Sequence, residues 1–458
     1  MKKIILCALL SIFCFKAANA QQLEPFKDGD RVVFLGNSIT HAGFYESYVW
    51  LYYMTHFPER KVQILNGGSG GDVVGQMYAR FEDDILKMNP NIVVLTFGMN
   101  DSGYAEFWQD DAEKTAKQRI AKSAHDFKLM QEKLMSYPDI KPAIMSTSPF
   151  DETVKIDANN FIGKSKTIEE IVAFQEKGAA KNNWPYIDLY HPMLEITQRE
   201  QQSDSAYTIT GPDRIHPGKP GHLVMASIIL KSQGLAGKPV ADIAINADAA
   251  SIDKAENAKV YLLNAKKDQV SFQYEAQSLP YPIDSTSGAW GNPQQLGDAL
   301  KVYPFVKEFN QEILKVDNLN AGNYKLLIDG NEIAQFTAAD FTKGINMANY
   351  GNTPQYKQAK NVMFLNEQRA EIEGKLREYE WVQSNFFRDK GMLYEDSQQA
   401  FDAASSTDNI FVTSKMGIYR TARFPEIRKM WEDNLKILVD KIYEINKPKT
   451  HRIEIIKV

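Results

Sequence analysis

A serine follows an apolar, strand-like run near the start of the chain. Residues 32–35 read Val-Val-Phe-Leu, and Gly36, Asn37 and Ser38 come directly after them. A tight turn after a buried strand is a typical place to display a nucleophile. Ser38 is equally suited to cap the helix expected from about residue 44, because serine and asparagine are both favoured at helix N-caps. This stretch alone leaves both roles open.

Two further stretches could supply hydrogen-bond donors to an oxyanion. Residues 66–72, Asn-Gly-Gly-Ser-Gly-Gly-Asp, follow a second apolar run, and glycines let backbone N–H groups approach a ligand closely. Asn100 follows a third strand-like run, 92–96, where a side-chain amide could donate to an oxyanion. The plain alternatives are a flexible turn for the glycines and an Asx-turn or helix cap for Asn100.

A histidine that could act as a base lies in the sequence Asp213-Arg214-Ile215-His216. An acid three residues earlier can accept a hydrogen bond from Nδ1 and leave Nε2 free to take a proton. Asp188 and His191 have the same spacing and form a rival pair. A lone histidine beside a proline is otherwise a common surface turn residue.

In their order and spacing, the four stretches resemble the sequence blocks of the SGNH hydrolases, also called GDSL esterases and lipases. The resemblance covers roughly residues 30–235. It implies that Ser38 is the nucleophile, His216 the base and Asp213 the residue that orients the base. It also favours His216 over His191, because only His216 is followed by the family's Pro-Gly-x-x-Gly-His pattern.

The resemblance further implies an oxyanion hole. Its donors would be the backbone N–H groups of Ser38 and Gly71 and the side chain of Asn100. Gly71 is preferred to Gly70 because the family's glycine stands immediately before an aspartate. The sequence departs from the family name at Asn37, where an aspartate is usual, but that position carries no catalytic role.

The pattern between residues 31 and 234 alternates short apolar runs with longer periodic segments, which predicts a parallel sheet with helices on both faces. The resemblance implies an SGNH-type, flavodoxin-like α/β/α domain of three layers. The expected strands end at Leu35, Leu65, Phe97, Met145 and Asp188, and the expected helices run over 45–56, 76–88, 120–135, 168–181 and 222–231.

Substrate contacts are expected beside these blocks. Segment 102–117 is predicted to be a long loop that brings aromatic side chains next to Asn100, and long loops beside a site are often lids or binding loops. Asp72, Tyr104 and Trp108 are therefore candidate substrate-binding residues, although the aromatics could instead cover core. The flanking positions are polar, which suits hydroxyl groups better than methylenes: Asn37, Thr40, His41, Ser69, Asp72, Asp101, Ser102, Asp213 and Arg214.

The composition changes after the hydrolase domain, which we place at residues 21–240. A linker-like stretch, 241–250, opens a small β module at 241–345, which is either a carbohydrate-binding sandwich or a structural module. Residues 346–458 are predicted to be helical, with one helix starting at Thr353-Pro354 and another near Pro425. Residues 452–458 would close the chain as an edge strand.

The first 20 residues combine two lysines, an apolar stretch and an Ala-Asn-Ala ending, which is the pattern of a cleaved secretory signal. Cleavage would make Gln21 the first mature residue. Cys7 and Cys14 both fall inside this signal, so the exported chain is expected to have no disulfide bonds.

Composition narrows the function classes further. No later apolar run reaches the ~18 residues of a membrane span, so no membrane association is expected after cleavage. A formal net charge of −5 argues against nucleic acid as a partner, because phosphate contacts need clustered lysine and arginine. Histidines are scattered and the mature chain lacks thiols, so we expect no metal site and no cofactor.

These features together predict an exported serine esterase, periplasmic or secreted, that hydrolyses short-chain acyl esters, above all O-acetyl groups on carbohydrate, through an acyl-enzyme intermediate. The alternatives within and outside this class are a lipase or lysophospholipase of SGNH type and a catalytically silent glycan-binding protein. The expected partner is an acetylated glycan or a small ester. The sequence leaves the sugar and the oligomeric state open.

Overall fold

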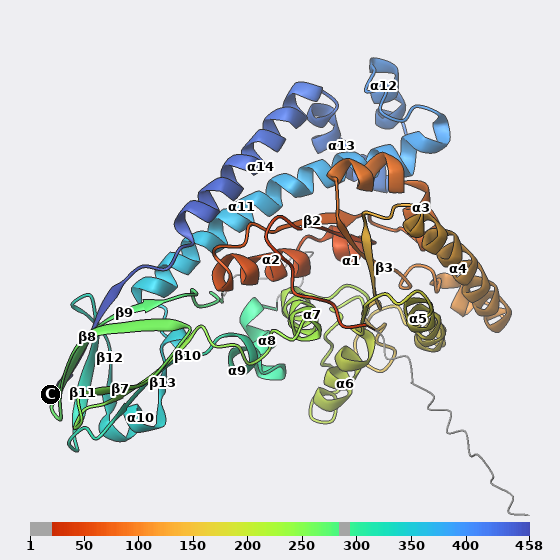
Figure 1. Ribbon diagram of the computed structural model, residues 1–458. Coiled ribbons are helices and arrows are strands. Elements are labelled where there is room, and N and C mark those ends of the chain that lie inside the picture. Colours follow the sequence, from red (N-terminus) through yellow and green to blue (C-terminus); the bar gives the residue numbers. More distant parts are fainter. Residues whose placement is uncertain (1–20, 284–293) are drawn as a thin grey trace, which may run out of the picture.

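The computed structural model describes residues 21–283 and 294–458. The predicted signal peptide, residues 1–20, lies outside the described residues. Figure 1 shows a helix-covered sheet domain, a separate β module, and two long helices that run from the module along the sheet domain. Among the described residues, no helix combines the length and apolar character that crossing a membrane requires.

The first domain is built on five parallel strands in the order β2-β1-β3-β4-β5. This is the flavodoxin-like order, in which the chain reverses direction across the sheet between β1 and β3 and ligands bind at the strands' carboxyl ends. The predicted fold class is therefore confirmed. The strands are β1 (Arg31–Gly36), β2 (Gln63–Gly68), β3 (Ile92–Thr96), β4 (Lys141–Met145) and β5 (Tyr186–Ile187).

The central strands are apolar on both faces because helices cover both sides of the sheet. Val32 and Phe34 belong to one core cluster, while Val33 and Leu35 belong to another. Helices that contribute to the first cluster include α2 (Tyr45–His56), α6 (Tyr190–Glu200) and α7 (Lys219–Ser232). Helices that contribute to the second are α3 (Val74–Ala79), α4 (Ala112–Met135) and α5 (Lys164–Lys181).

Two expectations about these helices are wrong. Segment 102–117 is not a long loop, because a short 3-10 turn (Ala105–Trp108) is followed by α4 from Ala112. The helix expected over 76–88 is broken after α3 by a π-helical turn and a 3-10 turn. The break turns Arg80 and Asp84 into the protein interior, where both side chains are fully buried. Single π turns of this kind often mark functional regions.

The β module contains two sheets, ordered β13-β10-β6-β7 and β12-β11-β14-β9-β8. The predicted linker at 241–250 is wrong, because β6 begins at Ala241. Ala241, Ile243 and Ile245 point inward at every second position, as in a half-buried strand. The many alanines of this short stretch made that alternation hard to recognise in the sequence. The module's strands are β6 (Ala241–Asn246), β7 (Ser251–Glu256), β8 (Ala258–Lys266), β9 (Gln269–Ala276), β10 (Glu312–Asp317), β11 (Asn323–Ile328), β12 (Asn331–Thr337), β13 (Ile345–Asn346) and β14 (His451–Lys457).

The last strand is not an edge strand. β14 pairs with β11 on one side and β9 on the other, so it lies inside the five-stranded sheet. The C-terminal segment therefore returns from the helices to complete the β module. The module is also interrupted, because α9 (Phe305–Phe309) and the residues around Tyr281 pack into the core of the first domain.

Between β13 and β14 the chain forms four α-helices: α11 (Pro354–Val382), α12 (Gln398–Ser405), α13 (Ile410–Ala422) and α14 (Pro425–Ile445). The predicted start of α11 is confirmed, with the Thr353 side chain accepting a hydrogen bond from the Tyr356 N–H and proline at the first helical position. α11 and α14 lie side by side (Figure 1) and dock on the first domain. Tyr443 marks this docking, since its hydroxyl donates to Val62 O at 3.0 Å.

Candidate active site

The predicted nucleophile stands at the carboxyl end of β1. The Asn37 side chain caps the short helix α1 (Ser38–His41) by accepting from the Ile39 N–H at 3.0 Å. The cap is therefore Asn37, which leaves the Ser38 hydroxyl available for another partner. Gly36 is required here, because a Cβ on it would lie 2.1 Å from Thr40 Oγ1.

Three side chains form a continuous hydrogen-bonded row. Ser38 Oγ lies 2.8 Å from His216 Nε2, and His216 Nδ1 lies 2.6 Å from Asp213 Oδ2. The other Asp213 oxygen accepts from the backbone N–H groups of Ile215 and His216 at 3.0 and 2.9 Å. Burial opposes ionisation of Asp213, but its bonds with His216 outweigh that effect and lower its pKa. The structure thus brings together residues that lie 178 positions apart.

Arg214, which we expected at the rim of the site, instead anchors the loop that carries this row. Its backbone is in the left-handed region, with φ of 67°, and its guanidinium is buried. It donates to four carbonyl oxygens of the neighbouring loop: Asp151, Val154, Ile156 and Ala158. Arg214 therefore fixes Asp213 and His216 and does not face a substrate.

The rival pair occupies a different place. His191 Nδ1 lies 2.8 Å from Asp188 Oδ2 at the start of α6, and both side chains are exposed. The geometry favours His216, which is the imidazole within reach of Ser38. The other nearby histidine, His222, is buried against the Tyr45 ring, and burial lowers its pKa to about 3. His222 therefore packs the first turns of α7 as a neutral side chain.

The glycine loop after β2 lies directly against α1. A Cβ on Gly68 would lie 2.2 Å from the His41 backbone nitrogen, so no larger residue fits there. Gly71 has a φ of 88°, which glycine adopts readily. The Gly70 N–H already donates to His41 Nδ1 at 3.3 Å. With the Gly70 N–H engaged in this way, the Gly71 N–H stays the loop's candidate donor to a substrate.

Asn100 faces the same loop from the end of β3. Its Nδ2 donates to Asp72 O at 2.9 Å, and its Oδ1 accepts from the Tyr104 hydroxyl at 2.6 Å. An amide nitrogen carries two hydrogens, so the second can serve an oxyanion. Tyr104, predicted to bind substrate, is thus placed to fix the orientation of the Asn100 amide.

Lys164 is a functional-site residue that the sequence analysis missed. Its buried Nζ donates to Met99 O, Ser102 Oγ and Gly103 O, each at 2.5 Å, and so clasps the loop that carries Asn100. Burial holds its pKa well below the ordinary value of lysine. A lone lysine at the start of a helix gave no signal of this role.

Of the other predicted substrate contacts, Asp72 and the polar rim need correction, whereas Trp108 stays a prediction. Asp72 is wrong as a substrate-binding residue, because it is 0% exposed and bonds Arg80 Nε at 2.6 Å. Trp108 is 57% exposed, and its ring lies tilted against that of Phe161, with the ring centroids 4.9 Å apart. The polar rim is also wrong, since most of its members are buried: Asn37, Thr40, Ser69, Asp72, Asp101, Ser102 and Arg214.

Asp72 belongs to a buried ionic cluster that ties α11 to the sheet. Arg80 joins Asp72 and Asp84 at 2.6 Å each, and Arg377 of α11 binds both oxygens of Asp84 at 2.6 and 2.7 Å. Burial works against the Asp84 charge, but the two arginines outweigh it and hold its pKa at about 2. Arg80 also donates to the carbonyl oxygens of Gly36 and Gly67, at the ends of β1 and β2.

Replacing Asp84 by asparagine should lower the free energy of unfolding by about 3–5 kcal/mol at pH 7, because it leaves buried guanidinium charge without its partner. Urea denaturation measures the change. The folded-state pKa is depressed, so this stabilisation is present above about pH 4 and is lost as the pH falls toward 2. The gap between variant and wild type should therefore narrow in acid.

The matched control is Glu113→Gln, which removes an exposed ion pair with Lys117. Such pairs contribute little, so a change below about 1 kcal/mol is expected. Equal effects of the two variants would show that the cluster around Asp84 is not a principal tie between α11 and the sheet.

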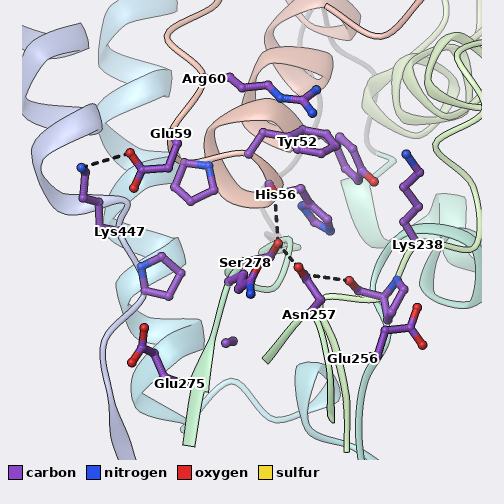
Figure 2. A pocket seen from close by; sticks show the side chains of 16 residues that line it. Tyr52, His56, Glu59, Arg60, Lys238, Glu256, Asn257, Glu275, Ser278 and Lys447 are labelled. Carbon is purple, nitrogen blue, oxygen red and sulfur yellow. Dashed lines mark hydrogen bonds and ion pairs between the residues drawn. The ribbon is translucent and has the colours of Figure 1, made fainter. Parts of the chain in front are cut away.

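A wide cleft lies apart from these residues, where the end of α2, the β module and the segment after α14 meet (Figure 2). Its volume is about 870 Å³. The side chains across it bind one another: Lys447 pairs with Glu59 at 3.3 Å, and Asn257 donates to Ser278 Oγ at 2.9 Å. These interactions therefore hold together the parts of the chain that line the cleft. Among the described residues, no group of three or more His, Cys, Asp or Glu side chains is arranged to hold a metal ion.

Comparisons with known proteins define the class of this chain. Residues 34–224 match the model of the GDSL-like lipase/acylhydrolase family. The chain belongs to this family and is an SGNH-type esterase, so the resemblance drawn from the four sequence stretches is confirmed. Residues 360–447 match a second model, the diltiazem deacetylase C-terminal helical domain.

Two relatives are of particular use. The structure of BT4096, a gut microbial diltiazem-metabolizing enzyme, is 42% identical, and the match covers 96% of this chain and 100% of that one with a TM-score of 0.93. The acetylxylan esterase of Geobacillus stearothermophilus is 24% identical over 222 residues, which are 45% of this chain and 94% of the relative. The first likeness therefore includes the β module and the helices, whereas the second spans less than half of the chain.

Proposed function

We propose that this esterase uses Ser38 as its nucleophile, His216 as its general base and Asp213 as the residue that orients the base. Ser38 Oγ attacks the ester carbonyl carbon while His216 takes its proton, and the proton then passes to the departing alkoxide. Water attacks the acyl-enzyme with the same assistance and releases the acid. The observation that carries the proposal is the short row of hydrogen bonds from Ser38 to Asp213.

The proposed oxyanion hole consists of the N–H groups of Ser38 and Gly71 and the side chain of Asn100. All three stand at the carboxyl ends of β1, β2 and β3, which are neighbours in the sheet. Charge that develops on the carbonyl oxygen would meet donors that are already oriented by the fold.

A fluorophosphonate probe tests this assignment against a catalytically silent binding protein. Such a probe phosphonylates an activated serine, so we expect one label per chain, located at Ser38 by peptide mapping. An unlabelled chain that still binds glycan would instead support the silent alternative.

The acyl group of the substrate is proposed to be short, with acetyl as the best fit. The cavity beside the His216 imidazole measures about 90 Å³ and is lined by Ile39, Phe44 and Pro217, among others. Its lining does not include Ser38, Gly71 or Asn100, so its size alone does not limit the acyl group. The support for a short acyl group comes from the names of one relative, an acetylxylan esterase, and of the second matching family model, a diltiazem deacetylase domain.

Acetyl esters should accordingly exceed octanoyl esters in kcat/KM by at least about tenfold, which corresponds to about 1.4 kcal/mol of transition-state binding. A lipase would show the reverse trend, because each buried methylene contributes about 0.8 kcal/mol. The p-nitrophenyl esters of acetate, butyrate and octanoate measure the trend, with their spontaneous hydrolysis as the blank. An optimum at octanoate would favour the lipase alternative.

The alcohol is proposed to be an O-acetylated carbohydrate, and the distant acetylxylan esterase relative supports this choice. Tyr104, Phe161 and Trp108 form an aromatic row leading outward from Asn100, on which a sugar ring could stack. The polar residues that were expected to form the rim of the site are mostly buried, so they do not support a carbohydrate substrate.

A second candidate alcohol is apolar and aromatic, as in diltiazem. It is favoured by exposed apolar side chains: Trp108 of the same row is 57% exposed, and Ile162, which follows Phe161 in the chain, is 67% exposed. The relative that matches nearly the whole chain metabolises diltiazem. Measuring kcat/KM for an acetylated xylo-oligosaccharide and for diltiazem with one enzyme preparation ranks the two.

Export is also part of the proposal. It is supported by the signal-like composition of residues 1–20. N-terminal sequencing of the protein recovered from the periplasm or the medium should begin at Gln21, whereas an intact N-terminus in the cytosol would contradict export.

A further inference from the structure

One face of α11, the first helix of the C-terminal helical region, lies against the glycine loop of the active site. Four side chains spaced four residues apart project from successive turns of this helix and its π-helical extension: Glu373, Arg377, Trp381 and Asn385. Residues at this spacing share one helix face. They reach a segment more than 300 positions earlier in the chain.

The four side chains each bind a different residue of that segment. The bonds run from the Asn66 N–H to Glu373 Oε1 (3.1 Å), from Arg377 Nε and Nη2 to Gly68 O (3.2 and 3.1 Å), from Trp381 Nε1 to Gly70 O (2.7 Å) and from Asn385 Nδ2 to Ser69 Oγ (2.9 Å). The loop that carries a proposed oxyanion donor is thus held along its length by another part of the chain.

Trp381 lies nearest to the nucleophile. A Cβ built on Gly70 would lie 3.6 Å from Trp381 Nε1 and 4.0 Å from Ser38 Cβ, so one residue separates the indole from the serine. The Trp381 side chain is almost wholly buried, at 7% exposure. Its bond to Gly70 O is therefore shielded from competition by water.

The bond to Gly70 O has a geometric consequence for Gly71. The Gly70 carbonyl and the Gly71 N–H belong to one planar trans peptide, so they point in opposite directions. Holding the carbonyl toward the helix aims the Gly71 N–H away from it. Without such a restraint, two adjacent glycines have wide conformational freedom.

The other side of Gly70 is restrained as well. The Gly70 N–H donates to His41 Nδ1, and His41 Nε2 lies 3.3 Å from Glu378 Oε1 on the same helix. Burial lowers the pKa of His41, although Glu378 opposes this effect, and a neutral ring can accept at Nδ1 while donating from Nε2. Lys415 of α13 pairs with Glu378 at 2.7 Å.

We propose that Trp381 is a positioning residue of the active site, which orients the Gly71 N–H toward the oxyanion through its hydrogen bond to Gly70 O. The C-terminal helical region is then part of the catalytic apparatus and not only a covering of the hydrolase domain. This inference rests on the proposed function, in which Ser38 attacks and Gly71 is an oxyanion donor.

The test is Trp381→Phe, which keeps an aromatic ring and removes only the N–H donor and the second ring. A misdirected oxyanion donor weakens the transition state more than the bound ester, so kcat should fall by roughly 10- to 100-fold while KM changes by less than about threefold. Affinity for a methylboronic acid, whose tetrahedral adduct on serine imitates the transition state, should fall in parallel.

The matched control is Tyr443→Phe. It also removes buried hydrogen bonds between a C-terminal helix and the hydrolase domain, but these are at Val62, away from the glycine loop: one donated to Val62 O and one accepted from the Val62 N–H. A purely structural role of the helices predicts similar losses in both variants. The proposal predicts that Tyr443→Phe keeps kcat and boronate affinity within about threefold of wild type.

Further variants distinguish a failure of the positioning role of Trp381 from a failure of the proposed esterase function. Asn385→Ala removes the bond to Ser69 without touching the ionic cluster, and should lower kcat in the same direction as Trp381→Phe. Ser38→Ala is measured alongside: if it stays active, the proposed function fails. If Ser38→Ala is inactive while folded Trp381→Phe and Asn385→Ala keep wild-type kcat and boronate affinity, the positioning role is overturned and the esterase assignment stands.

Discussion

Replacing Ser38 by alanine should abolish ester hydrolysis and leave the protein folded. The substitution removes one oxygen atom, which lies 2.8 Å from His216 Nε2, and the turn keeps its cap because the cap is Asn37. Removing a catalytic serine alone can lower kcat as much as removing the serine, the base and its orienting acid together. We therefore expect kcat to fall by roughly 10⁴-fold or more. Initial rates with p-nitrophenyl acetate measure the loss.

The control for this variant is Ser136→Ala, a serine-to-alanine change at the exposed end of α4. It should retain wild-type kcat, and both variants should give the circular dichroism spectrum of the wild type. Residual hydrolysis by Ser38→Ala well above the spontaneous rate would move the nucleophile to another residue.

Much of the first domain could be predicted because its signals are local. The strand ending at Leu35 is a continuous apolar run, as expected for a strand buried on both faces, and the helix over 45–56 agrees with α2 residue for residue. The four sequence stretches lie at strand ends or in loops, where side-chain type and order are visible in the sequence. The fold then brings Ser38 and His216 together without any local cue.

The environment of the site could not be predicted, because burial is a property of the whole fold. Asp72 follows the glycines like a rim residue, yet the π turn after α3 brings Arg80 to it in the interior. The prediction of a polar rim around the site was wrong for the same reason, since most of its residues are buried by other parts of the fold. A polar side chain in a loop reads as exposed unless its partner, here a distant arginine, is known.

The C-terminal contact with the glycine loop was hidden in a similar way. The apolar residues of α11, such as Ile372 and Tyr379, recur at helical spacing, and this face is visible in the sequence. The face that meets the active site carries Arg377 and Asn385 instead, and charged residues at helical spacing ordinarily indicate a solvated face. Only the tertiary structure shows that these polar groups are satisfied by backbone carbonyls and a buried aspartate.

The position of strand β14 in the middle of its sheet could not be predicted from the sequence either. Its sequence, His-Arg-Ile-Glu-Ile-Ile-Lys, alternates in the way of a half-exposed strand, and such a pattern does not reveal its neighbours. Pairing with β9 and β11 joins segments separated by more than 120 residues. The β module is consequently completed by a strand that follows the four C-terminal helices in the sequence.

Removing the Asn100 side chain should have the second largest effect on catalysis. The amide is held on both sides, with Nδ2 bound to Asp72 O and Oδ1 bound to the Tyr104 hydroxyl, so its second N–H hydrogen has a fixed direction. Loss of one preorganised oxyanion donor costs roughly 10²–10³-fold in kcat. Because the donor acts on charge that exists mainly in the transition state, Asn100→Ala should leave KM nearly unchanged.

Tyr104→Phe separates the donor from its support. It removes the hydroxyl that holds Oδ1 but keeps the amide, the ring and the contact with Phe161, so its loss in kcat should be about tenfold or less. Steady-state kinetics of both variants with p-nitrophenyl acetate give the comparison. Equal losses would mean that the hydroxyl of Tyr104 itself contacts the reacting ester. A loss below about threefold for Asn100→Ala would leave the backbone N–H groups of Ser38 and Gly71 as the oxyanion donors, and would make the orientation of that glycine peptide by Trp381 more important still.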